Sequence, residues 1–192
     1  MLTEQKLKGE IITLRQIEIS DCVSSYVEWL NDSRVNCYLE TRWNRQSLES
    51  VREFVKAQRE NDHSILFAIT LVDGGCHIGN IKIGPVNWQH RHGDISYFIG
   101  DTRYWKKGIA TEAINLVCKF GFECLNLHRI EASVYAAAVA SWKALEKNGF
   151  LREGVFRRKV ITDIGGGYMD IYRYGLLESE FQEFLHKEIT KK

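Results

Sequence analysis

The segment from Trp105 to Ala113, WKKGIATEA, constrains the fold of this chain more than any other stretch. A strand-like run, Asp94 to Ile99, precedes it, and a helix is predicted to begin at about Lys107. Apolar residues then recur at helical spacing, at positions 110, 113, 114, 117, 120 and 124. The first N–H groups of a helix lack intrahelical partners, and the helix dipole adds positive charge there. A strand, a turn containing Gly108 and a helix together predict an anion site, although an ordinary helix start is the simpler alternative.

The rest of the chain alternates predicted strands and helices, with a hairpin signal at Asp73-Gly74-Gly75 and a helix end at Gly149. This order is typical of an α/β fold in which helices cover both faces of a mixed sheet. The strand–helix–strand unit around Gly108 is expected to be a right-handed parallel crossover, with a ligand where the strands part. Strands are predicted over residues 10–15, 64–72, 76–83, 94–99, 129–135, 151–161 and 168–176, and helices over 22–30, 47–60, 107–124, 139–148 and 178–189.

Composition narrows the class of protein. A length of 192 residues with 44% hydrophobic and 27% charged residues suits one globular domain, residues 1–192. The net charge of +1 favours neither nucleic acid nor an acidic membrane as a partner. The five cysteines have no metal-type spacing and are odd in number, which indicates reduced thiols in a cytoplasmic protein. No apolar run approaches the roughly 20 residues that span a bilayer.

The string YWKKGIATEA resembles the pyrophosphate-binding loop of the GNAT acetyltransferase superfamily, whose core pattern is Gln/Arg-x-x-Gly-x-Gly/Ala. Gly108 and Ala110 match the last two fixed positions, and Trp105 stands where Gln or Arg is commoner. Trp105 followed by IATEA resembles the RimJ/RimL-type branch, which usually has glycine in place of Lys106. IGNIKIGP resembles the third strand of the family, and ASWKALEKNGF resembles its fourth helix, so the likeness covers nearly the whole chain.

The resemblance implies the GNAT fold, a twisted, mainly antiparallel mixed sheet with helices on both faces and splayed central strands. It also implies an acetyl-CoA-dependent N-acetyltransferase, acting as a monomer or a homodimer on a primary amine. A backbone N–H near Phe98 or Ile99, where the fourth strand of the family bulges, would stabilise the oxyanion. Ala138 occupies a position that usually carries an Asn contacting the pantetheine of CoA. The residues expected to bind the pyrophosphate are Trp105, Lys106, Lys107, Gly108, Ile109, Ala110 and Thr111.

Proton transfer has several candidate residues. His90, His92 and Asp94 lie just before the acetyl-binding strand, and a histidine pKa of about 6.5 suits a base. The alternative of a polar loop residue without a role is equally good for either histidine, and better for Asp94. Ser141 begins the fourth helix, where its hydroxyl would assist the thiol leaving group or simply make a helix-start hydrogen bond.

The chain lacks the tyrosine that many GNAT enzymes carry four residues before the glycine that ends the fourth helix, because this position is Leu145. General acid–base catalysis contributes about 10²–10⁴-fold, so turnover remains feasible without that tyrosine. A lysine amine, with a pKa of about 10.4, demands a stronger base than an α-amine of about 8. This favours an α-amine or an amino-sugar amine, and the resemblance to the RimJ/RimL-type branch implies a protein N-terminus as acceptor. An amino-sugar nucleotide, or a catalytically weak acyl-CoA-binding protein, are the alternatives.

Overall fold

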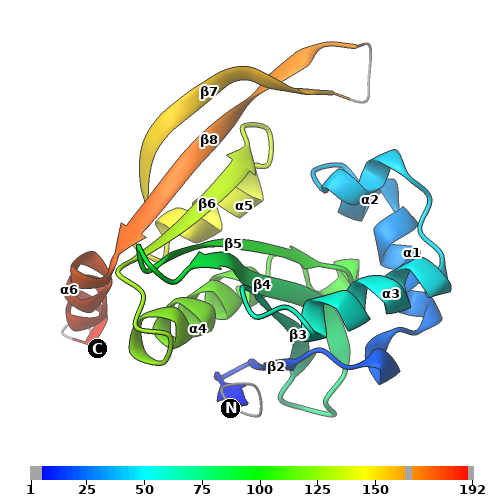
Figure 1. Cartoon of the computed structure of the whole chain (residues 1–192), viewed down its shortest axis with the longest axis horizontal. Helices are drawn as coiled ribbons and strands as arrows, with labels where there is room; N and C mark the ends of the chain where they lie inside the picture. Colours follow the sequence, from blue (N-terminus) through cyan, green and yellow to red (C-terminus); the bar gives the residue numbers. More distant parts are fainter. Residues whose placement is uncertain (1–5, 163–165, 190–192) are drawn as a thin grey trace.

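The computed structural model describes residues 6–162 and 166–189, and within them the strands form one open eight-stranded sheet of order β1-β2-β3-β4-β5-β6-β8-β7 (Figure 1). This mixed, mainly antiparallel sheet confirms the expected fold class. The strands are β1 (Leu7–Lys8), β2 (Ile12–Gln16), β3 (Ile65–Leu71), β4 (His77–Asn87), β5 (His92–Ile99), β6 (Arg129–Tyr135), β7 (Leu151–Ile161) and β8 (Tyr168–Leu177). The α-helices are α1 (Ser24–Asn31), α2 (Ser33–Asn36), α3 (Leu48–Arg59), α4 (Ile109–Glu123), α5 (Val139–Glu146) and α6 (Glu178–Ile189), and the 3-10 helices are η1 (Ile19–Asp21), η2 (Glu40–Trp43) and η3 (Thr102–Tyr104).

Strands β5 and β6 are the parallel pair, and they part after three residue pairs. The last pair is Asp94 with Glu131, beyond which β5 continues to Ile99, while β6 pairs with β8 on its other side along its whole length. This confirms the predicted crossover, since α4 connects the two strands. We use the name crevice for the opening between Ile95–Ile99 of β5 and the end of β6.

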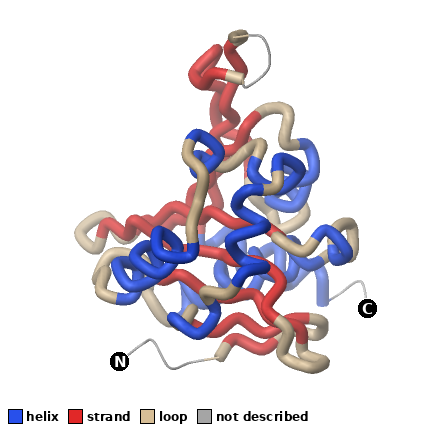
Figure 2. Tube along the Cα trace, turned by 90° about the vertical axis from the view of Figure 1, so that its right-hand side faces the viewer, coloured by secondary structure: helices blue, strands red, loops and turns tan. Residues whose placement is uncertain are grey.

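Two apolar cores flank the sheet, and β3 contributes to both because it is buried on both faces. Phe67 and Ile69 join the larger core with α4, α5 and α6, while Leu66 and Ala68 join the smaller core with α1 and α3. The nearly continuous apolar run of this strand follows from that double burial. Helices therefore cover both faces, as Figure 2 also shows.

The structure corrects several predicted boundaries. Strand β4 continues through Gly84-Pro85 to Asn87, and α4 begins at Ile109, two residues later than expected. The bulge expected on β5 near Phe98 is absent, because β5 pairs regularly with β4 from Ile95 to Ile99. The register shift lies on the opposite strand, between Ile83 and Val86.

Strands β7 and β8 form a long curved arm that rises above the rest of the molecule in Figure 1. Nearly every residue of β7 is exposed, since it is the edge strand of the sheet. The turn predicted between these strands includes residues 163–165, which lie outside the described residues. In the part of the chain that the structure describes, no helix is both long and apolar enough to cross a bilayer.

Candidate functional site

The loop before α4 adopts left-handed backbone geometry at two positions. Gly108, the N-cap of α4, has φ 81°, and Lys106 has φ 60°. This conformation costs a residue with a side chain about 1–2 kcal/mol. The lysine found in place of the usual glycine therefore keeps the loop conformation, at a cost in stability.

The surface at Gly108 is open and polar. A Cβ atom built on Gly108 has no other atom within 4 Å, and no side chain caps the first turn of α4. Lys106 and Lys107 are exposed beside it, and the Lys107 ammonium lies 5.1 Å from the ring centre of Tyr104. An uncapped helix N-terminus with adjacent lysines suits an anionic group, as the sequence predicts.

Three side chains hold this loop in place, and sequence reasoning singled out only Trp105 among them. The Glu112 carboxylate accepts hydrogen bonds from backbone N–H groups at residues 10–12, which ties α4 to the start of β2. The Asn148 side chain, almost fully buried, donates to the carbonyls of Thr111 (3.1 Å) and Ala144 (2.8 Å), which joins α4 to α5. The Trp105 indole donates to the Ile99 carbonyl at 2.8 Å. The loop is therefore fixed relative to both walls of the crevice.

Strand alternation determines which backbone groups of β5 face the crevice. The N–H of Gly100 donates to the Ile78 carbonyl on β4 at 2.8 Å, so alternate N–H groups point away from β4. Ile99 and Tyr97 therefore direct their N–H groups towards the crevice, while that of Phe98 faces β4. Of the two predicted donors, the geometry leaves Ile99 available for a ligand.

A hydrogen-bonded pair joins β5 to the start of α5. The Tyr97 hydroxyl lies 2.9 Å from both the hydroxyl and the carbonyl oxygen of Ser141. Burial raises the pKa of Tyr97 to about 12, against the opposing effect of the Ser141 hydrogen bond. The Tyr97 hydroxyl therefore keeps its proton at neutral pH. Ser141 lies in the first turn of α5, close to the predicted helix start, but its partner Tyr97 was missed because nothing in the sequence pairs them.

Two positions where the chain departs from the family lack polar side chains in the crevice. Ala138 is the N-cap of α5, is buried, and offers only its backbone. Leu145 is fully buried in the larger core. The site of the usual tyrosine thus serves packing in this chain.

The two histidines lie at the closed end of the β5–β6 pair. His90 is exposed in the turn before β5, and His92 begins β5 opposite Arg129 of β6. Because a strand rises about 3.3 Å per residue, His92 is about 23 Å along β5 from Ile99, where the crevice is open. His92 lies two residues before Asp94, where the strands part, so the role of either histidine at the acceptor mouth stays a prediction.

Charged side chains meet where β5 and β6 part. The Arg173 guanidinium, on β8, lies 2.5 Å from a Glu131 oxygen, 2.5 Å from the Ser133 hydroxyl and 3.3 Å from an Asp94 oxygen. Arg129 binds the other oxygen of Glu131 at 2.6 Å and both oxygens of Glu153. The hydrogen bonds that Arg129 donates to Glu153 and Glu131 outweigh the effect of burial and raise the pKa of Arg129 above its usual value. Two arginines thus balance part of the charge of three carboxylates.

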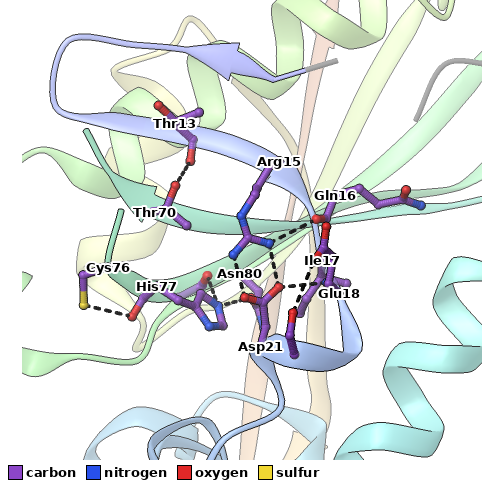
Figure 3. Close-up of polar contacts among 12 residues, drawn as sticks. Thr13, Arg15, Gln16, Ile17, Glu18, Asp21, Thr70, Cys76, His77 and Asn80 are labelled. Carbon is purple, nitrogen blue, oxygen red and sulfur yellow. Dashed lines mark hydrogen bonds and ion pairs between the residues drawn. The ribbon is translucent and has the colours of Figure 1, made fainter. Parts of the chain in front are cut away.

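A second polar group lies on the α1 side of the sheet (Figure 3). Arg15 forms a two-point ion pair with Asp21, at 2.6 and 2.7 Å. Burial acts to raise the pKa of Asp21, but the Arg15 guanidinium and the Glu18 N–H together hold it below its usual value. His77 lies 2.7 Å from the Asn80 amide oxygen, and burial lowers the pKa of its imidazole.

Nearer the open end of the crevice, η2 contacts the end of β6. The Tyr135 hydroxyl donates to Glu40 and accepts from Arg42, at 2.9 Å for the latter. The Arg42 guanidinium lies over the rings of Trp43 and Tyr135. This contact places η2 beside the end of β6. Among the described residues, no cluster of His, Cys, Asp and Glu is arranged to hold a metal ion.

Comparisons with known proteins match this geometry. The model of the acetyltransferase (GNAT) domain matches residues 12–151. An uncharacterised N-acetyltransferase of Bacillus subtilis (strain 168), YnaD, is 31% identical over 173 residues, which are 88% of this chain and 95% of that protein. Mycobacterium smegmatis RimJ in complex with CoA-disulfide has a TM-score of 0.82 at 22% identity, over 99% of this chain and 96% of that chain. Spermidine N-acetyltransferase from Vibrio cholerae, in complex with CoA and spermine, has a TM-score of 0.79 at 23% identity, over 89% of this chain and 98% of that chain.

Proposed function

Because this chain belongs to the GNAT acetyltransferase family and is an acyltransferase that uses acetyl-CoA, we propose that it acetylates the α-amine of a protein N-terminus, as RimJ/RimL-type enzymes do. The observation that carries the site is the open, uncapped N-terminus of α4 beside the crevice. The acceptor is argued from the chemistry of the residues around that crevice.

The loop before α4 is the proposed site of the CoA pyrophosphate. The N–H groups from Lys106 to Thr111 would bind its oxygens, with Lys106 and Lys107 supplying charge. Trp105 fixes the loop through the Ile99 carbonyl, and Gly108 leaves space above the backbone. Phe98 holds the other face of β5, where it packs in the smaller core.

The crevice is the proposed path of the pantetheine arm. The Ile99 N–H would bind an amide of that arm, and Ala138, without a side-chain amide, leaves this task to the backbone. The Tyr97 N–H, closer to the point where the strands part, would stabilise the oxyanion, which is worth about 3 kcal/mol. Ser141 would donate a hydrogen bond to the departing thiolate. The Tyr97 hydroxyl holds the Ser141 hydroxyl beside β5 for this role.

The choice of an α-amine follows from acid–base arithmetic. With a pKa of about 10.4, about one lysine amine in a thousand is neutral at pH 7.4, against about a third of α-amines. This difference corresponds to an apparent barrier of about 3–4 kcal/mol, of which the greater nucleophilicity of lysine returns part. A carboxylate is too weak a base to deprotonate a lysine ammonium ion, so the carboxylates near the crevice do not close that gap.

Thiol release from acetyl-CoA tests the proposal. The amines are a peptide with a free α-amine, its Nα-blocked counterpart with one lysine, spermidine and a 4-amino-sugar nucleotide, each at pH 7. We expect turnover with the free α-amine and little with the blocked peptide. Equal rates for both peptides would contradict the α-amine assignment. Turnover of the sugar or spermidine alone would assign those acceptors, and release with none would indicate an acyl-CoA-binding protein.

A further inference from the structure

The charged cluster where β5 and β6 part contains one carboxylate with fewer hydrogen-bond partners than the others. Both oxygens of Glu131 accept arginine hydrogen bonds, from Arg129 at 2.6 Å and from Arg173 at 2.5 Å. Both oxygens of Glu153 accept from Arg129. Asp94 has only the 3.3 Å contact of its Oδ1 with Arg173, and its Oδ2 has no partner among the described residues. The excess negative charge of the cluster therefore resides on Asp94.

Asp94 is also more accessible than Glu131, the other carboxylate of the last β5–β6 residue pair. Its side chain is 36% exposed, against 17% for Glu131. It belongs to the last residue pair before the strands separate, so its free oxygen lies at the floor of the crevice. Ser96 and Ser133, both exposed, extend this polar floor on the two strands beyond Asp94. An amino group that enters the crevice meets one unbalanced carboxylate there.

We propose that Asp94 is the base of the acetyl transfer, taking the proton of the acceptor nitrogen directly or through one water molecule. This inference rests on the proposed function, because it assumes that an amine enters the crevice. Ser141 on α5 and Asp94 on β5 then divide the two proton tasks. Asp94 acts on the attacking nitrogen and Ser141 on the departing sulfur.

In the proposed step, the lone pair of the neutral amine forms the C–N bond, and the C–S bond breaks with its electron pair left on sulfur. The nitrogen becomes positively charged as it attacks, which makes its proton far more acidic than in the free ammonium ion, so a carboxylate suffices to accept it. Asp94 passes this proton to solvent, and the thiolate takes up a proton, assisted by the Ser141 hydroxyl. The acceptor would also bind more tightly, because the Asp94 carboxylate attracts the cationic form of its amine.

Arg173 and Glu131 are positioning residues in this scheme. Arg173 restrains Asp94 from one side by a long contact, while its stronger bonds go to Glu131 and the Ser133 hydroxyl. A shorter and two-point ion pair would hold the Asp94 carboxylate too strongly for it to act as a base. The arrangement fixes Asp94 and leaves one oxygen free.

The variant Asp94→Asn tests this role, with Asp73→Asn as the control, which removes one carboxylate from an exposed turn. We measure kcat at pH 6–9 with the amine that the wild type prefers, and the affinity for acetyl-CoA by calorimetry. We expect a fall in kcat of about 10²–10⁴-fold at pH 7 and unchanged acetyl-CoA affinity. The deficit should shrink as the pH rises, because hydroxide then accepts the proton of the attacking nitrogen in place of Asp94. The control is expected to match the wild type.

Several results would overturn the proposal. These are wild-type kcat in Asp94→Asn at every pH, or a deficit that does not change with pH. Loss of acetyl-CoA affinity together with turnover would assign Asp94 a structural role. If Asp94→Asn does not fold, Asp94→Ser takes its place, with the same expected pH profile and with rescue by added acetate or formate. A wild type that turns over no amine defeats the proposed function itself, whereas turnover in both proteins defeats only the role of Asp94.

Discussion

The two sides of the crevice are built from different kinds of sequence. On the cofactor side, β5, the loop at Gly108 and α4 follow one another along the chain, and local capping and backbone geometry shape the surface. On the acceptor side, Asp94, Glu131 and Arg173 come from three separate strands and meet only in the sheet. Contiguous residues therefore predict the cofactor site, whereas the proposed acceptor site depends on pairing between distant segments.

The largest expected effect breaks the cofactor side. Gly108→Glu should weaken acetyl-CoA binding more than about 100-fold, because like charges brought together cost several kcal/mol. Gly108→Ala is the matched control, since it carries the same left-handed strain of about 1–2 kcal/mol without the carboxylate. Calorimetric titration measures both affinities, and equal values for the two variants would remove the anion site from Gly108.

A smaller effect is expected at the wall formed by α5. Ser141→Ala should lower kcat about tenfold with little change in KM for acetyl-CoA, if the hydroxyl acts only in the transition state. Tyr97→Phe removes the partner hydroxyl and keeps the ring, so it reports how far that hydrogen bond orients Ser141. Wild-type kcat in Ser141→Ala would leave only a structural hydrogen bond.

Variants of Leu145, which lies on the same helix as Ser141, test packing rather than catalysis. Leu145→Tyr should destabilise the protein by about 1–3 kcal/mol, because the position is fully buried and a larger ring overpacks the core. Leu145→Met, of similar volume, is the control. Urea denaturation measures both free energies of unfolding. A rise in kcat in Leu145→Tyr would contradict the structure, since it would require this side chain to reach the crevice.

On the α1 side, His77 predicts a pH effect on stability. Burial holds the pKa of the His77 imidazole in the folded protein below its unfolded value of about 6.5. Between these two pKa values, the unfolded state therefore binds more protons than the folded state. The free energy of unfolding should therefore fall as the pH drops below about 6.5. His77→Gln should lack this component, as measured by thermal unfolding at pH 5.5 and 7.5. An unchanged pH dependence in the variant would exclude His77 as its source.

The smallest effect concerns the two histidines at the closed end of the crevice. His90→Ala and His92→Ala should leave kcat unchanged between pH 6 and 9, in contrast to Asp94→Asn, because both histidines precede the last β5–β6 pair, Asp94 with Glu131, at which the strands part. A loss of rate that is greatest below pH 7 would restore the histidine base and weaken the assignment to Asp94.

Most of the fold was predictable because its signals are local. The spacing of apolar residues identified α4 and α6. Strand-like runs of residues identified β6 and β7, both with their observed bounds. Gly149, at φ 86°, ends α5 as expected. The longer β4 and the register shift at Ile83 were missed, because strand continuation depends on the neighbouring strand rather than on local composition.

The sequence by itself determined the family and the cofactor, and it predicts the place of the anion site. Glycine at a left-handed position, an uncapped helix start and a helical apolar face are properties of consecutive residues, so they can be read along the chain. The tertiary structure decided which titratable groups face the acceptor. Asp94 is one acidic residue among many in the sequence, and it becomes distinctive only because Arg129 and Arg173 satisfy Glu131 and Glu153 and leave it partly unpaired. Charge balance of this kind depends on distances between strands, which no local pattern encodes.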